Sequence, residues 1–266
     1  MSDRNNTDHH ELIKEEFARQ ADSMLSASVF TDSDIVDRIG SAACVTDGLR
    51  VLDVGCGPGI MSAALAADAR EVVAFDLTPE MLQRARQRCE DAGLTNVQFQ
   101  LGQAEKLPFD NAEFDVIVTR LTFHHFLGPS IAISEMARVI SPDGRIVIAD
   151  IVSSEVPQEA ELHNALEILR DPSHVRMLPH SELTRLIESA GLNIKAEDSW
   201  IKKREFDEWI QITNSPGRAA PLSVVMRNLA EAGMKAGVDL RFNGTAIEFN
   251  HQWFLFVAEK TAKGIS

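Results

Sequence analysis

The sequence predicts one α/β domain organised around an open parallel sheet, and two observations carry this prediction. Strand-like apolar segments alternate with helix-like segments between residues 49 and 151, a pattern typical of parallel sheets with crossover helices. The glycine-rich turn Gly55-Cys56-Gly57-Pro58-Gly59 joins the first strand to the first of these helices, the junction at which such sheets bind ligands. At 266 residues, one domain with insertions is the default.

The region before the first strand is predicted to be helical. One helix is expected over residues 11–24, where Leu12 and Phe17 contribute to a partly apolar face, and a second over residues 34–44. Residues 1–45 could therefore form a lid over a cleft, or could simply pack on the sheet.

The parallel part of the sheet follows in order along the chain. Strands are expected over residues 50–54, 71–75, 97–101, 114–119 and 144–151. The helices between them are expected over residues 61–67, 79–92 and 130–140, and the turn signal Ser141-Pro142-Asp143-Gly144 ends the last of these.

The alternation loosens after residue 151. Helices are expected over residues 157–169 and 179–190, with Gly191 ending the second, followed by a strand over 192–200. Residues 206–238 are expected to be mostly helical, with breaks at 215–217 and at Pro221, before a last strand over 246–258. Helical cap insertions are therefore expected at about 152–180 and 205–245.

Composition excludes several classes of function. A formal net charge of −14 argues against nucleic acid or an anionic membrane surface as the main partner and favours a small molecule. The three cysteines have no pairing or metal-ligand spacing, and no segment resembles a signal peptide or membrane span. We expect a cytoplasmic protein, monomeric or homodimeric. Because tyrosine is absent, proton chemistry would depend on histidine and carboxylates.

Polar residues follow the first four strands where a ligand would lie. Asp53 precedes the glycines, whose G-x-G-x-G spacing differs from the dinucleotide pattern G-x-G-x-x-G. Asp76 follows the second strand, where a carboxylate can accept both hydroxyls of a ribose. Gln103 and Ala104 follow the third strand, and Arg120 the fourth. Asp53 could instead be only a helix cap, and Asp76 only a turn residue.

Five segments in this order resemble the class I S-adenosylmethionine (SAM) methyltransferases, and among them the quinone C-methylases. They are VLDVGCGPG (51–59), AFDLTPEML (74–82), GQAEKLPF (102–109), FDVIVTRLTFHHF (114–126) and EMARVISPDGRIVIAD (135–150). The resemblance implies a Rossmann-like sheet of seven strands, mostly parallel with an antiparallel last strand and with helices on both faces.

The resemblance also implies a set of cofactor-binding residues. Asp53 would support the ammonium of SAM, Asp76 would bind its ribose and Gln20 would contact it from the lid. Gln103 stands where the family usually has Asp. The full implied set comprises Gln20, Asp53, Gly55, Gly57, Gly59, Asp76, Leu77, Met81, Gln103, Ala104, Glu105 and Arg120.

Histidines supply the candidates for catalysis. His124 and His125 follow the fourth strand, and His125 is favoured as the base because the subgroup more often places histidine there. Both could instead be structural residues that satisfy loop backbone. His163, Arg170, His174 and Arg176 are candidates for substrate binding, or could pair with nearby carboxylates to fix a lid. We expect no metal site, because no H-E-x-x-H motif occurs.

The predicted function is SAM-dependent methyl transfer to oxygen or carbon of a small aromatic, quinone or polyketide-like metabolite. The main alternative is a SAM-binding enzyme that catalyses cyclisation, rearrangement or decarboxylation without methyl transfer, using the sulfonium as a fixed charge. The sequence also leaves open a non-catalytic SAM binder and a nicotinamide-dependent dehydrogenase, although the glycine spacing argues against the dehydrogenase.

Overall fold

The computed structural model describes residues 2–25 and 27–260, the side chains of residues 2–6 and 28 excepted. The predicted lid, 1–45, and main domain, 46–266, include residues 1, 26 and 261–266, which lie outside the described residues. Within the described part, no helix is both long and apolar enough to cross a membrane.

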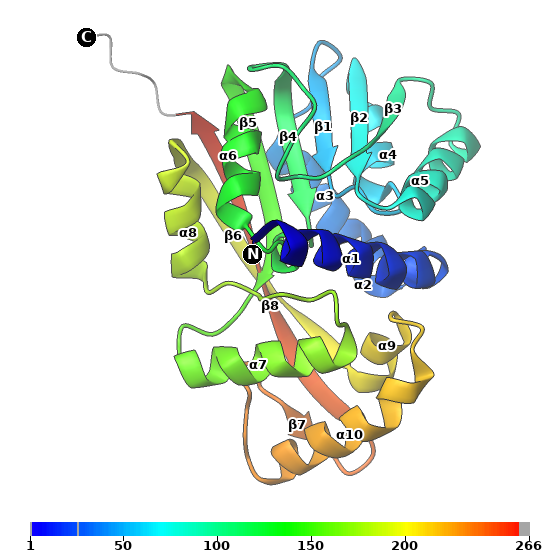
Figure 1. Ribbon diagram of the computed structural model, residues 1–266, viewed down its shortest axis with the longest axis vertical. Helices are drawn as coiled ribbons and strands as arrows, with labels where there is room; N and C mark the ends of the chain where they lie inside the picture. The colour runs from blue at the N-terminus through cyan, green and yellow to red at the C-terminus, as the bar shows by residue number, and fades with distance from the viewer. Residues whose placement is uncertain (1, 26, 261–266) are drawn as a thin grey trace.

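One twisted sheet forms the centre of the molecule (Figure 1), with strand order β3-β2-β1-β4-β5-β8-β6. The first five strands pair in parallel, whereas β8 pairs antiparallel with both β5 and β6. The predicted antiparallel last strand is therefore confirmed. The strands are β1 Arg50–Val54, β2 Glu71–Asp76, β3 Val97–Leu101, β4 Phe114–Arg120, β5 Ile140–Val152, β6 Leu192–Glu205 and β8 Ile247–Lys260, and the two-residue β7 Arg241–Phe242 pairs with β8.

Helices cover both faces of the sheet, as predicted, because the buried strands are apolar on both faces. Val51 packs in one cluster with α3 Ser33–Ala43 and α4 Ile60–Ala66. Its neighbour Leu52 packs in a second cluster on the other face, with α6 Pro129–Val139 and α8 His180–Ser189. Helix α5 Pro79–Asp91 contributes its fully buried Met81 to the first cluster.

A cap with its own apolar core lies beyond the sheet, at the bottom of Figure 1. It is built from α7 Pro157–Arg170, α9 Phe206–Gln211, α10 Pro216–Glu231 and β7. The long strands β6 and β8 connect the cap to the sheet, because their pairing continues from Leu192↔Lys260 to Glu205↔Glu248. Trp209, Met226 and Phe249 are among the most deeply buried residues of the cap core.

The N-terminal helix α1 Ser2–Met24 crosses the front of the molecule between the sheet and the cap (Figure 1). One stripe of this helix, residues His10, Ile13, Phe17, Gln20 and Met24, lines a cavity. Their spacing of three and four residues places them on one helical face. The short α2 Ser28–Thr31 follows and adds Val29 and Phe30 to the same cavity.

Several predicted boundaries are wrong. Helix α1 begins at Ser2, nine residues before the expected start at residue 11. Helix α10 continues through Pro221, which lies near its start and costs one helical hydrogen bond. Residues 232–238 are not helical, because Gly233 and Gly237 adopt positive φ angles. Strand β6 runs to Glu205 because β8 pairs along its whole length. The turn signal at 141–144 lies within β5 as an irregularity, since Ile140 pairs with Phe114 and Arg145 with Val116.

Candidate active site

One cavity lies at the carboxyl ends of the parallel strands, the edge at which such sheets bind ligands. The glycine loop and the residues after β2, β3 and β4 line one end. Residues of the cap, including Arg170, Arg204 and His251, line the other end, and α1 covers the space between. Two ligands could therefore lie side by side, one on the sheet and one against the cap.

The glycine loop approaches the cavity closely but has few free donors. The amides of Gly55 and Cys56 donate to the carbonyl of Phe75, and the amide of Gly59 donates to Cys56. The Gly57 amide donates to the Asp76 carboxylate at 2.8 Å. These four loop N–H groups thus bond within the protein and do not point at a ligand. The glycines of the loop contribute to the cavity because they have no side chains and leave space beside the backbone.

Gly57 and Gly59 differ in what an added methyl group would meet, although both have positive φ. At Gly59 a Cβ would lie 2.7 Å from the Ala85 backbone, whereas at Gly57 it would meet no protein atom within 4 Å. We expect Gly59→Ala to lower the free energy of unfolding by about 2–5 kcal/mol, through backbone strain and overpacking. Gly57→Ala should cost about 1–2 kcal/mol from strain alone, yet weaken ligand binding, because Gly57 lines the cavity. Urea unfolding and a SAM titration of both variants test this, and equal destabilisation would contradict it.

Two buried carboxylates flank the loop. Asp53 is 1% exposed and accepts a hydrogen bond from Ser62 at 2.5 Å, and burial raises its pKa to about 7. Asp76 accepts the amides of Gly57 and Thr78, each at 2.8 Å, and burial raises its pKa as well. Both residues line the cavity. A buried carboxylate without a cationic partner is costly, so the site suits a ligand that carries a positive group near Asp53.

The other residues of the predicted cofactor set divide into two groups. Leu77, Gln103, Ala104 and Glu105 line the cavity, and Glu105 lies 3.7 Å from His10 of α1. Gly59 and Met81 are absent from the cavity lining, and Met81 is fully buried in the core.

Arg120 joins the end of β4 to the lid. Its guanidinium donates to the carbonyls of Val29 and Phe30, at 2.6 and 3.0 Å, and burial lowers its pKa to about 10. The next residue, Leu121, lines the cavity with a φ of 56°, an unusual conformation for a bulky side chain. Strained backbone of this kind is common at binding sites.

His124 is oriented by a carboxylate. Its Nδ1 lies 2.7 Å from Oδ1 of Asp150, on β5, whose Oδ2 accepts the amides of Thr122 and Phe123. Burial lowers the pKa of His124, but the Asp150 charge outweighs burial and leaves the pKa above its ordinary value. His124 lines the cavity, and its Nε2 has no hydrogen-bond partner among the described residues. This is the geometry of an imidazole held ready to accept a proton.

His125 has a different environment. Its Nδ1 donates to the carbonyl of Ser173 at 2.9 Å, and its ring packs edge-on against Phe17 at 4.9 Å. Burial, with the neighbouring His124, lowers its pKa to about 4. It also lines the cavity. His125 is therefore neutral, and it is a much weaker base than His124.

A buried network behind these histidines fixes the lid. Asp171 accepts Gln20 of α1 at 2.9 Å and the Ser173 hydroxyl at 2.6 Å. His174 donates from Nε2 to Asn164 at 2.8 Å, and burial holds its pKa far below the ordinary value. Gln20 and His174 both line the cavity, but each already uses one of its polar atoms in a hydrogen bond within the protein.

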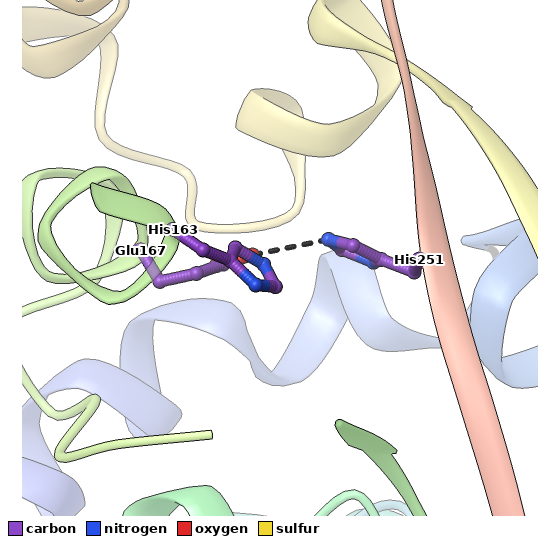
Figure 2. Close-up of side chains that lie close together, drawn as sticks. All are labelled: His163, Glu167 and His251. Carbon is purple, nitrogen blue, oxygen red and sulfur yellow. Dashed lines mark hydrogen bonds and ion pairs between the residues drawn. The ribbon is translucent and has the colours of Figure 1, made fainter. Parts of the chain in front are cut away.

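The cap end of the cavity is polar and buried. Arg170 donates to the Trp209 carbonyl and to Glu167, at 3.0 and 3.2 Å. Oε1 of Glu167 also lies 3.7 Å from Nε2 of His163 and 3.1 Å from Nε2 of His251. Figure 2 shows His163 and Glu167 together on α7, facing His251 of β8. Arg176 lies outside the cavity: its half-exposed side chain pairs with Glu182.

Comparison with known proteins decides what this cavity serves. A family model described as "Methyltransferase domain" matches residues 45–212. The chain belongs to this methyltransferase family. It is a SAM-dependent methyltransferase and not a nicotinamide-dependent dehydrogenase.

Individual relatives agree with this methyltransferase assignment. YcgJ of Bacillus subtilis, described as an uncharacterized methyltransferase, is 34% identical over 88% of this chain and 93% of its own length. The crystal structure of YcgJ superposes with a TM-score of 0.81 at 30% identity, over 86% of this chain and 99% of that one. A demethylmenaquinone methyltransferase of Clavibacter sepedonicus is 39% identical over 71% of each chain.

Several residues of this methyltransferase site are not predictable as such from the sequence. Asp150 is the last residue of the motif 135–150, and that motif assigns Asp150 no role in the site. Phe17 and Met24 are expected only as part of the lid helix. Arg204 and His251 lie in β6 and β8, outside the motifs, and reach the cavity only because those strands extend into the cap. His251 was the one available signal, as the only histidine of the largely apolar β8, whereas Arg204 lies among other charged residues of β6.

Proposed function

We propose that this methyltransferase transfers the methyl group of SAM to an oxygen or carbon of a small acceptor, with His124 as the general base. The observation that carries the proposal is the 2.7 Å contact between His124 and Asp150 at the cavity wall. It replaces His125, the base favoured from the sequence, because His124 has the oriented ring and the raised pKa.

The cavity fits the cofactor at its sheet end. Asp76 would accept the two ribose hydroxyls, since each carboxylate oxygen has a lone pair left after its backbone bond. Asp53 would neutralise the ammonium group, which would relieve the cost of its burial. Leu77 and the Gln103-Ala104 segment would flank the adenine, and Gln20 and Phe17 would close over the ligand from α1.

We expect SAM affinity to fall as the pH drops below 7. The pKa of Asp53 is about 7 without a ligand, and an ammonium partner would lower it by favouring the charged carboxylate. Binding then requires an ionised Asp53, so below pH 7 the affinity should fall by about tenfold per pH unit. Isothermal titration between pH 5.5 and 8 measures this, and Asp53→Asn should flatten the curve. A flat curve for the wild type would exclude the proposed role of Asp53.

SAM supplies an electrophilic methyl group on a positively charged sulfur, and the chain provides the conditions for its transfer. Nε2 of His124 would take the proton of an acidic hydroxyl or carbon as the acceptor attacks. Asp150 would hold the ring and stabilise the imidazolium that forms. Closure by α1 would exclude water and hold the acceptor against the methyl group.

The acceptor we favour is an aromatic or quinone-like metabolite. Apolar residues from the lid and cap, such as Ile13, Met177 and Ile212, line the cavity beside the polar histidines, and they suit a planar ring with one acidic position. The relative named as a demethylmenaquinone methyltransferase supports this class.

Formation of S-adenosylhomocysteine tests the proposal. The enzyme is incubated with SAM and fractions of a small-molecule extract, and the product is followed by mass spectrometry. We expect formation that depends on an apolar, aromatic fraction, and strongly reduced formation by His124→Asn. Formation that is unaffected by His124→Asn would contradict the proposed base.

A further inference from the structure

The cap end of the cavity contains a buried cluster of His163, Glu167 and His251 (Figure 2). His163 and Glu167 lie one turn apart on α7, and His251 faces them from β8. Their exposed fractions are 3%, 2% and 2%. The ordinary role of such a cluster is a network of internal hydrogen bonds, and the geometry satisfies that role only in part: Glu167 accepts from His251 at 3.1 Å, but His163 makes no such bond.

His163 is the residue of this cluster that lacks hydrogen bonds. Both of its ring nitrogens are buried without a hydrogen-bond partner among residues 2–25 and 27–260, and so is Nδ1 of His251. Buried polar atoms are nearly always bonded, and each unbonded one costs about 1–3 kcal/mol. Nε2 of His163 lies 3.7 Å from Oε1 of Glu167, which is too long for a hydrogen bond.

The spacing of the three ligand atoms suits a metal ion. Oε1 of Glu167 lies 3.7 Å from Nε2 of His163 and 3.1 Å from Nε2 of His251, and all three ligand positions lie within 4.8 Å of one another. Metal–ligand bonds of about 2.1 Å at tetrahedral angles place ligand atoms about 3.4 Å apart. An ion between them would bond to Nε2 of His163 and so give one of its two unbonded ring nitrogens a partner.

We propose that His163, Glu167 and His251 bind one divalent transition-metal ion, such as Zn²⁺, at the cap end of the cavity. Two imidazoles and one carboxylate are three ligands, the number typical of sites that keep a position open. Glu167 and His251 line the cavity whereas His163 does not. The open position therefore faces the cavity, where it could take water or an oxygen of a bound molecule.

The two nearby arginines are compatible with this site. Arg170 bonds to Oε2 of Glu167 at 3.2 Å, which leaves Oε1 for the ion and orients the carboxylate from behind, as partners of metal ligands commonly do. Arg204 donates to Glu208 at 2.9 Å, so that carboxylate offsets its charge. The sequence predicted no metal site because His251 is 84 residues from Glu167 and no local motif exists.

Metal binding by the full-length chain, freed of any affinity tag and treated with chelator, tests the proposal. We expect Zn²⁺ to bind at one equivalent and to raise the melting temperature, and Co²⁺ to give the visible absorption of a low-coordinate site. Glu167→Gln and His251→Gln should each weaken binding at least 100-fold. His180→Gln is the matched control, since His180 pairs with Glu197 on the surface, and should bind as the wild type does.

Either of two results would overturn the proposal: no ion bound at one equivalent, or binding that both cavity variants retain. If His251→Gln does not fold, Glu167→Gln, which preserves shape, decides the outcome alone. Because the measurement needs no acceptor and no SAM, its failure is separate from failure of the proposed methyl transfer.

Discussion

Replacement of Asp76 by alanine is expected to weaken SAM binding by at least 100-fold. Two hydrogen bonds from the ribose to a carboxylate contribute about 1.5–3 kcal/mol each, and each 1.4 kcal/mol corresponds to about tenfold in affinity. The variant also removes the acceptor for the amides of Gly57 and Thr78, so the glycine loop loses support. Isothermal titration with SAM measures the effect.

Asp115→Ala is the matched control for this variant. Its carboxylate likewise accepts a backbone amide, that of Arg50 at 2.8 Å, but from the opposite end of β4. We expect unchanged SAM affinity in this variant. Equal losses in both variants would mean that the loss reflects general destabilisation, and an unaffected Asp76→Ala would remove the ribose contact from the account.

His124→Asn is expected to lower kcat by about 10²–10³, the range typical of a lost general base. SAM affinity should stay within threefold of the wild type, because the contacts proposed for the cofactor lie on other residues. His125→Asn should cost less than about tenfold, since a neighbour with a pKa of about 4 contributes little as a base. The reverse order of effects would restore His125, the sequence-based preference.

The pH profile separates a base from a structural residue. The Asp150 carboxylate raises the pKa of His124, and only the deprotonated ring can accept a proton. The rate should therefore fall as the pH drops below that raised pKa. Asp150→Asn removes the charge and should move this acid limb to lower pH while lowering the rate at its plateau. An acid limb that stays in place would exclude titration of His124 as its cause.

The sheet end of the site could be predicted from sequence because its residues follow their strands directly. Asp53 lies just before the glycine loop and Asp76 is the last residue of β2. A parallel sheet brings such positions to one edge. The assignments of β1 to β4 succeeded for the same reason: apolar runs with glycine and proline boundaries are local signals.

The cap end could not be predicted, because it depends on pairing between distant segments. β6 extends five residues further than expected, and only its pairing with β8 brings Arg204 and His251 to the cavity. The choice between His124 and His125 also depends on a residue that is distant in the sequence. Adjacent residues look alike in sequence, and Asp150, 26 residues away, distinguishes them.

Transfer of label from methyl-labelled SAM to a small-molecule product tests the central claim most directly. The account predicts a product heavier by one methyl group that carries the label, formed by the wild type and Asp115→Ala and strongly reduced for Asp76→Ala and His124→Asn. Conversion of an acceptor with no gain of a methyl group, while all label stays in SAM, would contradict methyl transfer and favour a cyclisation or rearrangement that uses the sulfonium only as a charge.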